Sequence, residues 1–167
     1  MQVAAGENIA LLYEKSYTEA ESDDEPEDAD AETEASNGHG PRMIKRYTVY
    51  RQQHQLTQSL EALAKASSKR LSKKDRKQLH QSFTDILNTV EKPTRGPRYS
   101  TALDDDGKEY GSRLKITIHG GTKMTVDKWW KLHRFNGLKR LLQSGFLVHY
   151  ELNEVVFDSL PVVVEDE

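Results

Sequence analysis

The 167-residue sequence contains no cysteine, and this absence excludes several kinds of site. Disulfides, thiolate metal sites and a cysteine nucleophile cannot form. Long apolar runs are also missing, since no stretch approaches the roughly 20 apolar residues of a membrane-spanning helix. The N-terminus has no basic region followed by an apolar core, so no secretory signal is predicted. We therefore expect a soluble intracellular protein, cytoplasmic or nuclear (nucleoid), with no membrane partner.

Recognisable catalytic motifs are missing too. There is no Walker loop, Rossmann glycine pattern or nucleophile elbow. Six histidines are present, but none are spaced as a metal pair on one helical turn. The aspartates at 104–106 precede a glycine, yet the alternating ligands and terminal glutamate of a calcium loop do not follow. The sequence accordingly predicts a non-enzymatic protein that needs no cofactor and holds no metal.

Charge is abundant and strongly segregated. Apolar residues make up 35% of the chain and charged residues 31%, which indicates that part of the chain is not packed. Residues 1–40 carry twelve acids and one base, whereas residues 41–98 carry fourteen bases and four acids. Residues 99–167 are nearly balanced, with nine bases and eleven acids. Such a division predicts three zones with different surfaces.

The acidic zone divides into an amphipathic segment and a linker. In residues 1–18, apolar and aromatic side chains recur on one helical face, which favours a short helix over a short strand. Residues 19–41 contain a run of acids followed by glycine, serine and proline, and we predict a disordered acidic linker there. Three roles remain open for this arm: a solvated spacer, a competitor that covers the basic zone, or a ligand for a basic partner.

Residues 42–92 are predicted to form a basic helical hairpin. Pro41 can start the first helix, and a broken apolar stripe continues from Ile44 to about Ala66. Ser72, with Asp75 three residues later, is typical of an N-cap. The second helix has the strongest amphipathic pattern in the chain, carried by Leu79, Phe83, Ile86, Leu87 and Val90. A short link between the two helices favours an antiparallel pair.

The tip of this hairpin concentrates cations that suit a DNA or RNA phosphate backbone. The candidate nucleic-acid-binding residues are Lys65, Lys69, Arg70, Lys73, Lys74, Arg76 and Lys77. No glycine lies in the turn and no set of side chains is arranged for base edges, so binding would be sequence-independent. Solvated helix ends and a nuclear localisation signal are the other interpretations of these cations.

Residues 98–161 are predicted to form a small α+β domain, followed by an acidic tail at 162–167. Asp106-Gly107 is a hairpin turn signal, and residues 114–118 alternate as in a strand with one buried face. Thr125 is the expected N-cap of the following helix, and Gly145 its expected end. The predicted elements are strands at about 98–103, 109–119, 146–152 and 155–160, and a helix at 126–143.

The predicted helix at 126–143 carries both tryptophans and more apolar surface than one face can bury. Trp129 and Leu132 fall away from its main apolar arc, beside basic residues. Either Trp129 packs in the core, or it centres a partner-binding patch, because tryptophan and arginine are enriched in interface hot spots. The candidate patch consists of Trp129, Leu132, Lys128, Lys139 and Arg140.

These observations together predict an α+β protein with a disordered acidic N-terminal arm, a basic helical hairpin and a small antiparallel sheet packed against one Trp-bearing helix. The predicted function is a non-enzymatic protein-binding adaptor or assembly protein that uses the arm, the hairpin and the Trp-bearing helix. The alternative is a nucleic-acid-binding protein that uses the Lys65–Lys77 tip, with the acidic arm as its competitor.

Overall fold

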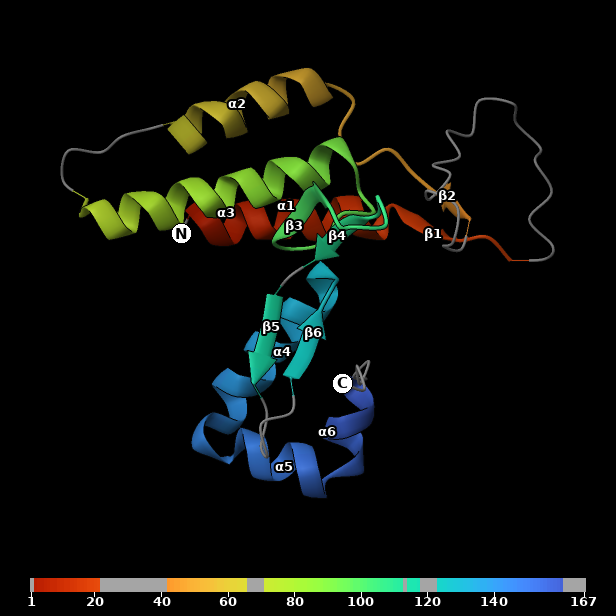
Figure 1. Cartoon of the computed structure of the whole chain (residues 1–167), viewed down its shortest axis with the longest axis vertical. Helices are drawn as coiled ribbons and strands as arrows, with labels where there is room; N and C mark the ends of the chain where they lie inside the picture. The colour runs from red at the N-terminus through yellow and green to blue at the C-terminus, as the bar shows by residue number, and fades with distance from the viewer. Residues whose placement is uncertain (1, 22–41, 66–70, 113, 118–122, 161–167) are drawn as a thin grey trace. The chain divides into compact units, whose positions relative to one another are not determined.

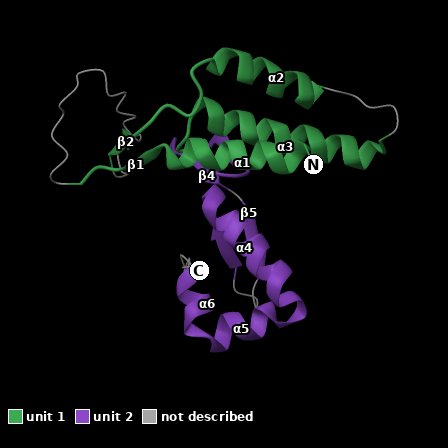
Figure 2. Ribbon diagram, turned by 180° about the vertical axis from the view of Figure 1, so that it is seen from behind, with its two compact units in different colours: residues 1–94 green, residues 95–167 purple. Residues whose placement is uncertain are grey.

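The computed structural model describes residues 2–21, 42–65, 71–112, 114–117 and 123–160. The chain divides into two compact units, residues 1–94 (unit 1) and 95–167 (unit 2), which Figure 2 shows in different colours. Helices and antiparallel pairs of strands together confirm the predicted α+β class. The predicted acidic linker lies almost entirely outside the described residues, as does the acidic tail.

Unit 1 is built around its longest helix. Its elements are α1 (Gln2–Lys15), β1 (Tyr17–Glu19), β2 (Met43–Lys45), α2 (Gln53–Lys65) and α3 (Lys73–Glu91). Both α1 and α2 pack against α3, as Figure 1 shows. The predicted helix in residues 1–18 is confirmed as α1.

Two side-chain hydrogen bonds establish that α2 and α3 are antiparallel. At the start of α2, the Gln53 amide donates to the carbonyl of Val90 near the end of α3, at 2.9 Å. At the other end, the His80 ring donates from Nδ1 to the Ala64 carbonyl, at 3.1 Å. The predicted helical pair is therefore present, with its connecting residues 66–70 outside the described part.

The core of unit 1 follows the amphipathic pattern of α3. Phe83 is 1% exposed, and Ile86 and Val90 are fully buried. The Ser72 hydroxyl accepts from the backbone N–H of Asp75 at 3.1 Å, which confirms the predicted N-cap. On α1, a Cβ added at Gly6 would lie 2.6 Å from Ile86 Cδ1, so this glycine lets α1 approach α3 closely.

The first helix of the hairpin begins later in the structure than the sequence predicts. Residues 43–45 form β2, which pairs with β1 in the register Tyr17↔Lys45, and α2 begins only at Gln53. The partner strand β1 lies more than twenty residues earlier in the chain, and a local helical pattern carries no information about such long-range pairing.

Unit 2 consists of short elements. They are β3 (Tyr99–Leu103), β4 (Glu109–Ser112), β5 (Leu114–Thr117), β6 (Lys123–Val126), α4 (Trp129–Leu142), the 3-10 turn η2 (Gln143–Gly145), α5 (Phe146–Leu152) and α6 (Glu154–Ser159). The β3–β4 and β5–β6 pairs are separate antiparallel hairpins. The predicted Asp106-Gly107 turn is confirmed in the first hairpin, where Gly107 has a positive φ of 77°.

The Trp-bearing helix begins later than predicted. Thr125 and Val126 belong to β6, where Val126 pairs with Leu114, and the helix begins at Trp129. Thr125 is therefore not an N-cap, and Lys128 occupies that position without a side-chain cap hydrogen bond. Met124 and Val126 belong to β6, and both side chains are buried in the core of unit 2. These core contacts outweigh the local preference of Thr125 for a helix N-cap.

The two strands predicted at 146–152 and 155–160 are wrong, because both segments are helical. Phe146 and Tyr150 are buried, and their rings stack with centroids 5.8 Å apart. Their spacing of four residues fits one helical face as well as it fits strand alternation. Asn153 then caps α6 by accepting from the Val155 N–H at 3.1 Å. Gly145 does not have the expected left-handed backbone, which occurs at Gln143 instead, with φ 48°.

The core of unit 2 collects one or two side chains from each of several elements. The buried cluster comprises Met124, Val126, Phe135, Phe146, Tyr150 and Leu160. Phe135 of α4 meets Phe146 of α5 edge-to-face, with ring centroids 5.3 Å apart. The Tyr150 hydroxyl donates to the Leu160 carbonyl at 3.1 Å, which holds the end of α6 against α5.

Candidate protein-binding surfaces

Trp129 lies in the interior. It is the first residue of α4 and is 2% exposed, so it offers a partner almost no surface. This placement favours the core alternative for Trp129 that the sequence left open. Large aromatic side chains contribute most to packing when they are buried in this way.

The partly exposed aromatic–basic cluster of α4 centres on the neighbouring tryptophan instead. The Trp130 ring is half-buried, and the Arg134 guanidinium lies over it with 5.2 Å from Cζ to the ring centroid. Lys131 approaches the same ring to 5.8 Å and also pairs with Asp127 at 2.7 Å. Arg134 donates to the Ser159 carbonyl at 2.7 Å. We name Trp130, Lys131 and Arg134 the Trp130 cluster.

The structure does not bring the other predicted partner-binding residues together around Trp129. Leu132 packs against the core cluster of unit 2, and Lys128 is half-buried at the helix start. Lys139 and Arg140 are exposed near the other end of α4, where Lys139 lies over the Phe135 ring at 5.6 Å. Positive charges in the last turn of a helix interact favourably with the helix dipole. This interaction accounts for the position of Lys139 and Arg140, and no binding partner is needed to explain it.

The C-terminal helices of unit 2 expose apolar side chains that the sequence analysis did not single out. Leu152 is 82% exposed and Val155 is 76% exposed. We define the C-terminal apolar surface as the exposed large apolar residues of α4, α5 and α6, namely Leu141, Leu147, Val148, Leu152, Val155 and Phe157. Because residues 146–160 were interpreted as strands, the faces of these helices could not be assigned.

The basic tip keeps its cations at the surface. Lys73, Lys74, Arg76 and Lys77 are all exposed in the first turns of α3, and Lys65 is exposed at the end of α2. Lys65 pairs with Glu61 at 3.3 Å. The two remaining predicted residues, Lys69 and Arg70, lie outside the described part of the chain.

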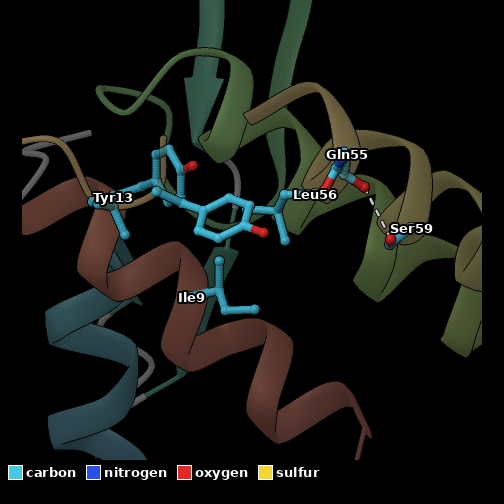
Figure 3. Close-up of a pocket in the computed structure, with 7 residues that line it drawn as sticks. Ile9, Tyr13, Gln55, Leu56 and Ser59 are labelled. Atoms are coloured by element: carbon cyan, nitrogen blue, oxygen red, sulfur yellow. Dashed lines mark hydrogen bonds between the residues drawn. The ribbon is translucent and has the colours of Figure 1, made fainter. Parts of the chain in front are cut away.

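A groove of about 390 Å³ in unit 1 is a further feature that the sequence analysis missed. Its lining comes from α1, α2 and the segment before α2, namely Ile9, Tyr13, Val49, Tyr50, Gln55, Leu56 and Ser59. Figure 3 shows Ile9 of α1 and Leu56 of α2 extending into it. The Ser59 hydroxyl donates to the Gln55 carbonyl at 2.9 Å, so it is already engaged within α2. The repeated apolar positions of α1 were visible in the sequence, but the space beside them depends on how α2 packs.

Three tyrosines have a raised pKa with a structural cause. Burial raises the pKa of Tyr150, and burial with the hydrogen bond to Glu109 raises the pKa of Tyr99 to about 12. Burial also raises the pKa of Tyr13, with a smaller contribution from Tyr50. No group of three histidine or acidic side chains is placed to hold a metal in the described ranges. None of the helices described is both long enough and apolar enough to cross a membrane.

Comparison with known proteins relates this architecture to one family. Residues 1–91, more than half of the chain, match the interferon-related developmental regulator (IFRD) family. The match ends at the last residue of α3, so it covers the elements of unit 1. The family relation therefore includes the helices that form the groove and the basic tip.

Individual relatives extend the similarity into unit 2. Interferon-related developmental regulator 1 of Mus musculus is 29% identical over 172 aligned positions, covering 99% of this chain. The Homo sapiens protein of the same name is 27% identical over the same share. An uncharacterized protein of Schizosaccharomyces pombe is 27% identical over 90% of this chain. The chain spans 28% of the length of the mouse and human relatives.

Proposed function

Because the chain belongs to the interferon-related developmental regulator family, we propose that it is a non-enzymatic regulatory protein that acts by binding other proteins as an adaptor or assembly factor. The observation that carries this proposal is the C-terminal apolar surface. Side chains such as Leu152 and Val155 remain largely in water although each could be buried at an interface. Contiguous exposed apolar patches mark interaction sites in soluble proteins, and the proposal takes these side chains to form one such patch.

The Trp130 cluster supplies the polar complement to that surface. A tryptophan flanked by Lys131 and Arg134 combines apolar contact area with fixed positive charge. Tryptophan and arginine are the residues that most often dominate binding energy at interfaces. The preferred partner would therefore present an apolar patch bordered by acidic side chains.

The test replaces the two most exposed members of the C-terminal apolar surface. Leu152→Ser with Val155→Ser removes apolar area but touches little of the core, so folding should be retained. Proteins bound to the cross-linked full chain are then quantified by mass spectrometry. We expect a defined set to be lost in this double variant and retained in a polar control, Asp105→Ser with Lys108→Ser. Identical recovery by all three proteins would contradict the proposal.

A second candidate function, sequence-independent nucleic-acid binding, is favoured by the basic tip. Four cations in the first turns of α3 are exposed, with Asp75 the acid among them. Phosphate binding by such residues releases counterions and weakens as salt rises. The acidic residues of the 19–41 segment would compete with the nucleic acid for the tip.

Anisotropy titration of labelled single- and double-stranded DNA and RNA tests this second candidate. Neutralising the acids between residues 23 and 34 is preferable to deleting residues 1–40, because α1 packs against α3. We expect salt-sensitive binding that strengthens on neutralisation and weakens when Lys73, Lys74 and Lys77 are changed to glutamate. Acids in the first turn suit the helix dipole, so the reversed variant should fold. Absence of binding by every variant would eliminate nucleic acid as a ligand.

A further inference from the structure

The groove of unit 1 lies between two helices that both pack against a third. Both α1 and α2 pack against α3, and the groove runs between them. Its lining is apolar or uncharged polar, and includes no acidic or basic side chain. A volume of about 390 Å³ falls within the range of about 300–1,000 Å³ that is usual for ligand sites. The lining chemistry therefore selects a neutral and mainly apolar occupant.

The Tyr13 hydroxyl shows that this site is chemically incomplete. Tyr13 lines the groove and is 5% exposed, and its hydroxyl has no hydrogen-bond partner among the described residues. Buried polar groups in folded proteins almost always have a partner. Burial also raises the pKa of this phenol, so it keeps its proton and acts as a donor at neutral pH. An occupant that brings a hydrogen-bond acceptor to the Tyr13 hydroxyl would satisfy it.

The shape of the apolar surface favours a helix over a compact small molecule. The groove is walled by two helices, with Ile9 and Tyr13 at i and i+4 of α1 and with Leu56 of α2 opposite them. Leu12 is 51% exposed and Tyr50 is 46% exposed, so apolar surface is also available on the segments that border the groove. In a recurring mode of recognition, an amphipathic helix lays its apolar face into a hydrophobic groove of this kind.

We propose that the groove binds an amphipathic helix of a partner protein, which inserts two apolar side chains between α1 and α2 and presents an uncharged acceptor to the Tyr13 hydroxyl. A side-chain amide of the bound helix, or one of its last four carbonyls, can supply this acceptor. A carboxylate is disfavoured, because burying its charge without a cation in the lining is costly. The inference rests on the proposed protein-binding function and adds a second surface to it.

The probe is a phage-displayed library of helical peptides with one randomised face, selected on the full chain. Ser59→Trp places a large side chain in the groove from an exposed position of α2. Gln58→Trp is the matched control, since Gln58 is exposed on the same helix and does not line the groove. Tyr13→Phe removes the donor and keeps the ring. Circular dichroism verifies that each variant is folded.

Selected peptides should share two apolar residues three or four positions apart. We expect their affinity to fall at least about tenfold for Ser59→Trp and to be unchanged for Gln58→Trp. Tyr13→Phe should weaken binding about three- to tenfold, as expected for one buried hydrogen bond. Peptides that bind Ser59→Trp as tightly as the original chain would overturn the groove proposal.

The same peptides distinguish this proposal from the broader function. If binding is lost in Leu152→Ser with Val155→Ser but not in Ser59→Trp, the groove proposal fails while protein binding through unit 2 stands. If the selection yields no binder at all, the groove proposal is contradicted, while the proposed function is still decided by its own test with Leu152→Ser and Val155→Ser. Loss in Ser59→Trp alone supports the groove as a site of its own.

Discussion

The cores of the two units are assembled from different sources. In unit 1, one helix of nineteen residues supplies Phe83, Ile86 and Val90 to the interior. In unit 2, the buried cluster is collected from β6, α4, α5 and Leu160. A long amphipathic helix can turn a continuous apolar face inward, whereas α5 and α6 have seven and six residues and one or two turns each. Short elements therefore bury a few anchors and leave neighbouring apolar side chains in water.

This difference produces two kinds of candidate binding surface. Unit 2 exposes the C-terminal apolar surface, which is an excess of apolar side chains beyond what its core can hold. Unit 1 buries the apolar face of α3, but it contains a groove with an unsatisfied hydroxyl and leaves Leu12 and Tyr50 partly exposed beside it. The C-terminal apolar surface offers exposed apolar area to a partner, whereas the groove of unit 1 offers a concave site. The following predictions test whether the two units really differ in this way.

The largest effect is expected for Phe83→Ala in unit 1. Removing a fully buried aromatic ring leaves a cavity and should lower the free energy of unfolding by about 3–5 kcal/mol. Urea denaturation followed by circular dichroism reports the whole chain, while fluorescence reports unit 2, because Trp129 and Trp130 both lie there. Phe157→Ala is the control, since this ring is half exposed. A loss of less than about 1 kcal/mol for Phe83→Ala would contradict the central role of α3.

Tyr150→Phe should produce the next largest effect, in unit 2. The change removes the hydrogen bond to the Leu160 carbonyl and leaves that buried acceptor unsatisfied, at a cost of about 1–3 kcal/mol. Tryptophan fluorescence during urea denaturation measures this loss of stability in unit 2. Tyr110→Phe, at a half-exposed ring, should change the free energy of unfolding by less than about 0.5 kcal/mol. Equal effects of the two substitutions would argue against a shared core between α5 and the end of α6.

Ser72→Ala tests whether the start of α3 is stabilised locally. Loss of the hydrogen bond from the Asp75 N–H to the Ser72 hydroxyl should cost about 1 kcal/mol. Ser72→Thr keeps a hydroxyl that can accept from the Asp75 N–H and donate to the Asp75 carboxylate, so it should retain most of the stability of the original chain. Denaturation midpoints followed by circular dichroism provide the comparison. If both substitutions destabilise α3 equally, the cap is not the cause.

The effect of Tyr99→Phe, the smallest in this series, is present at neutral pH and shrinks in alkali. Burial and the 2.7 Å hydrogen bond to Glu109 raise the pKa of Tyr99 from 10.0 to about 12. Because the folded pKa is the higher one, this contribution is present below pH 10 and is lost as the pH rises toward about 12. Stability of unit 2 should therefore fall across that window, and less steeply in Tyr99→Phe. Absorbance titration of the phenolates should show one late ionisation disappearing, and an unchanged titration would place Tyr99 in water.

Several features of the fold could be predicted because their causes are local. The burial of Phe83 and Ile86 follows from their helical spacing, and the start of α3 follows from the Ser72 cap. The hairpin at Asp106-Gly107 follows from the positive φ that glycine tolerates. Each of these depends on residues within a few positions of one another. The sequence therefore determined α3, its cap, this turn and the α+β class.

Only the tertiary structure decided the remaining elements and the candidate sites. Phe146 and Tyr150 are spaced suitably for a strand or a helix, and their joint packing with Phe135 selected the helix. Trp129 and Trp130 are adjacent in sequence, yet Trp129 is buried and Trp130 is only half-buried, at the centre of the Trp130 cluster. The groove beside Tyr13 exists because α1 and α2 occupy different parts of α3. Contacts between distant segments made these choices, and no local periodicity encodes such contacts.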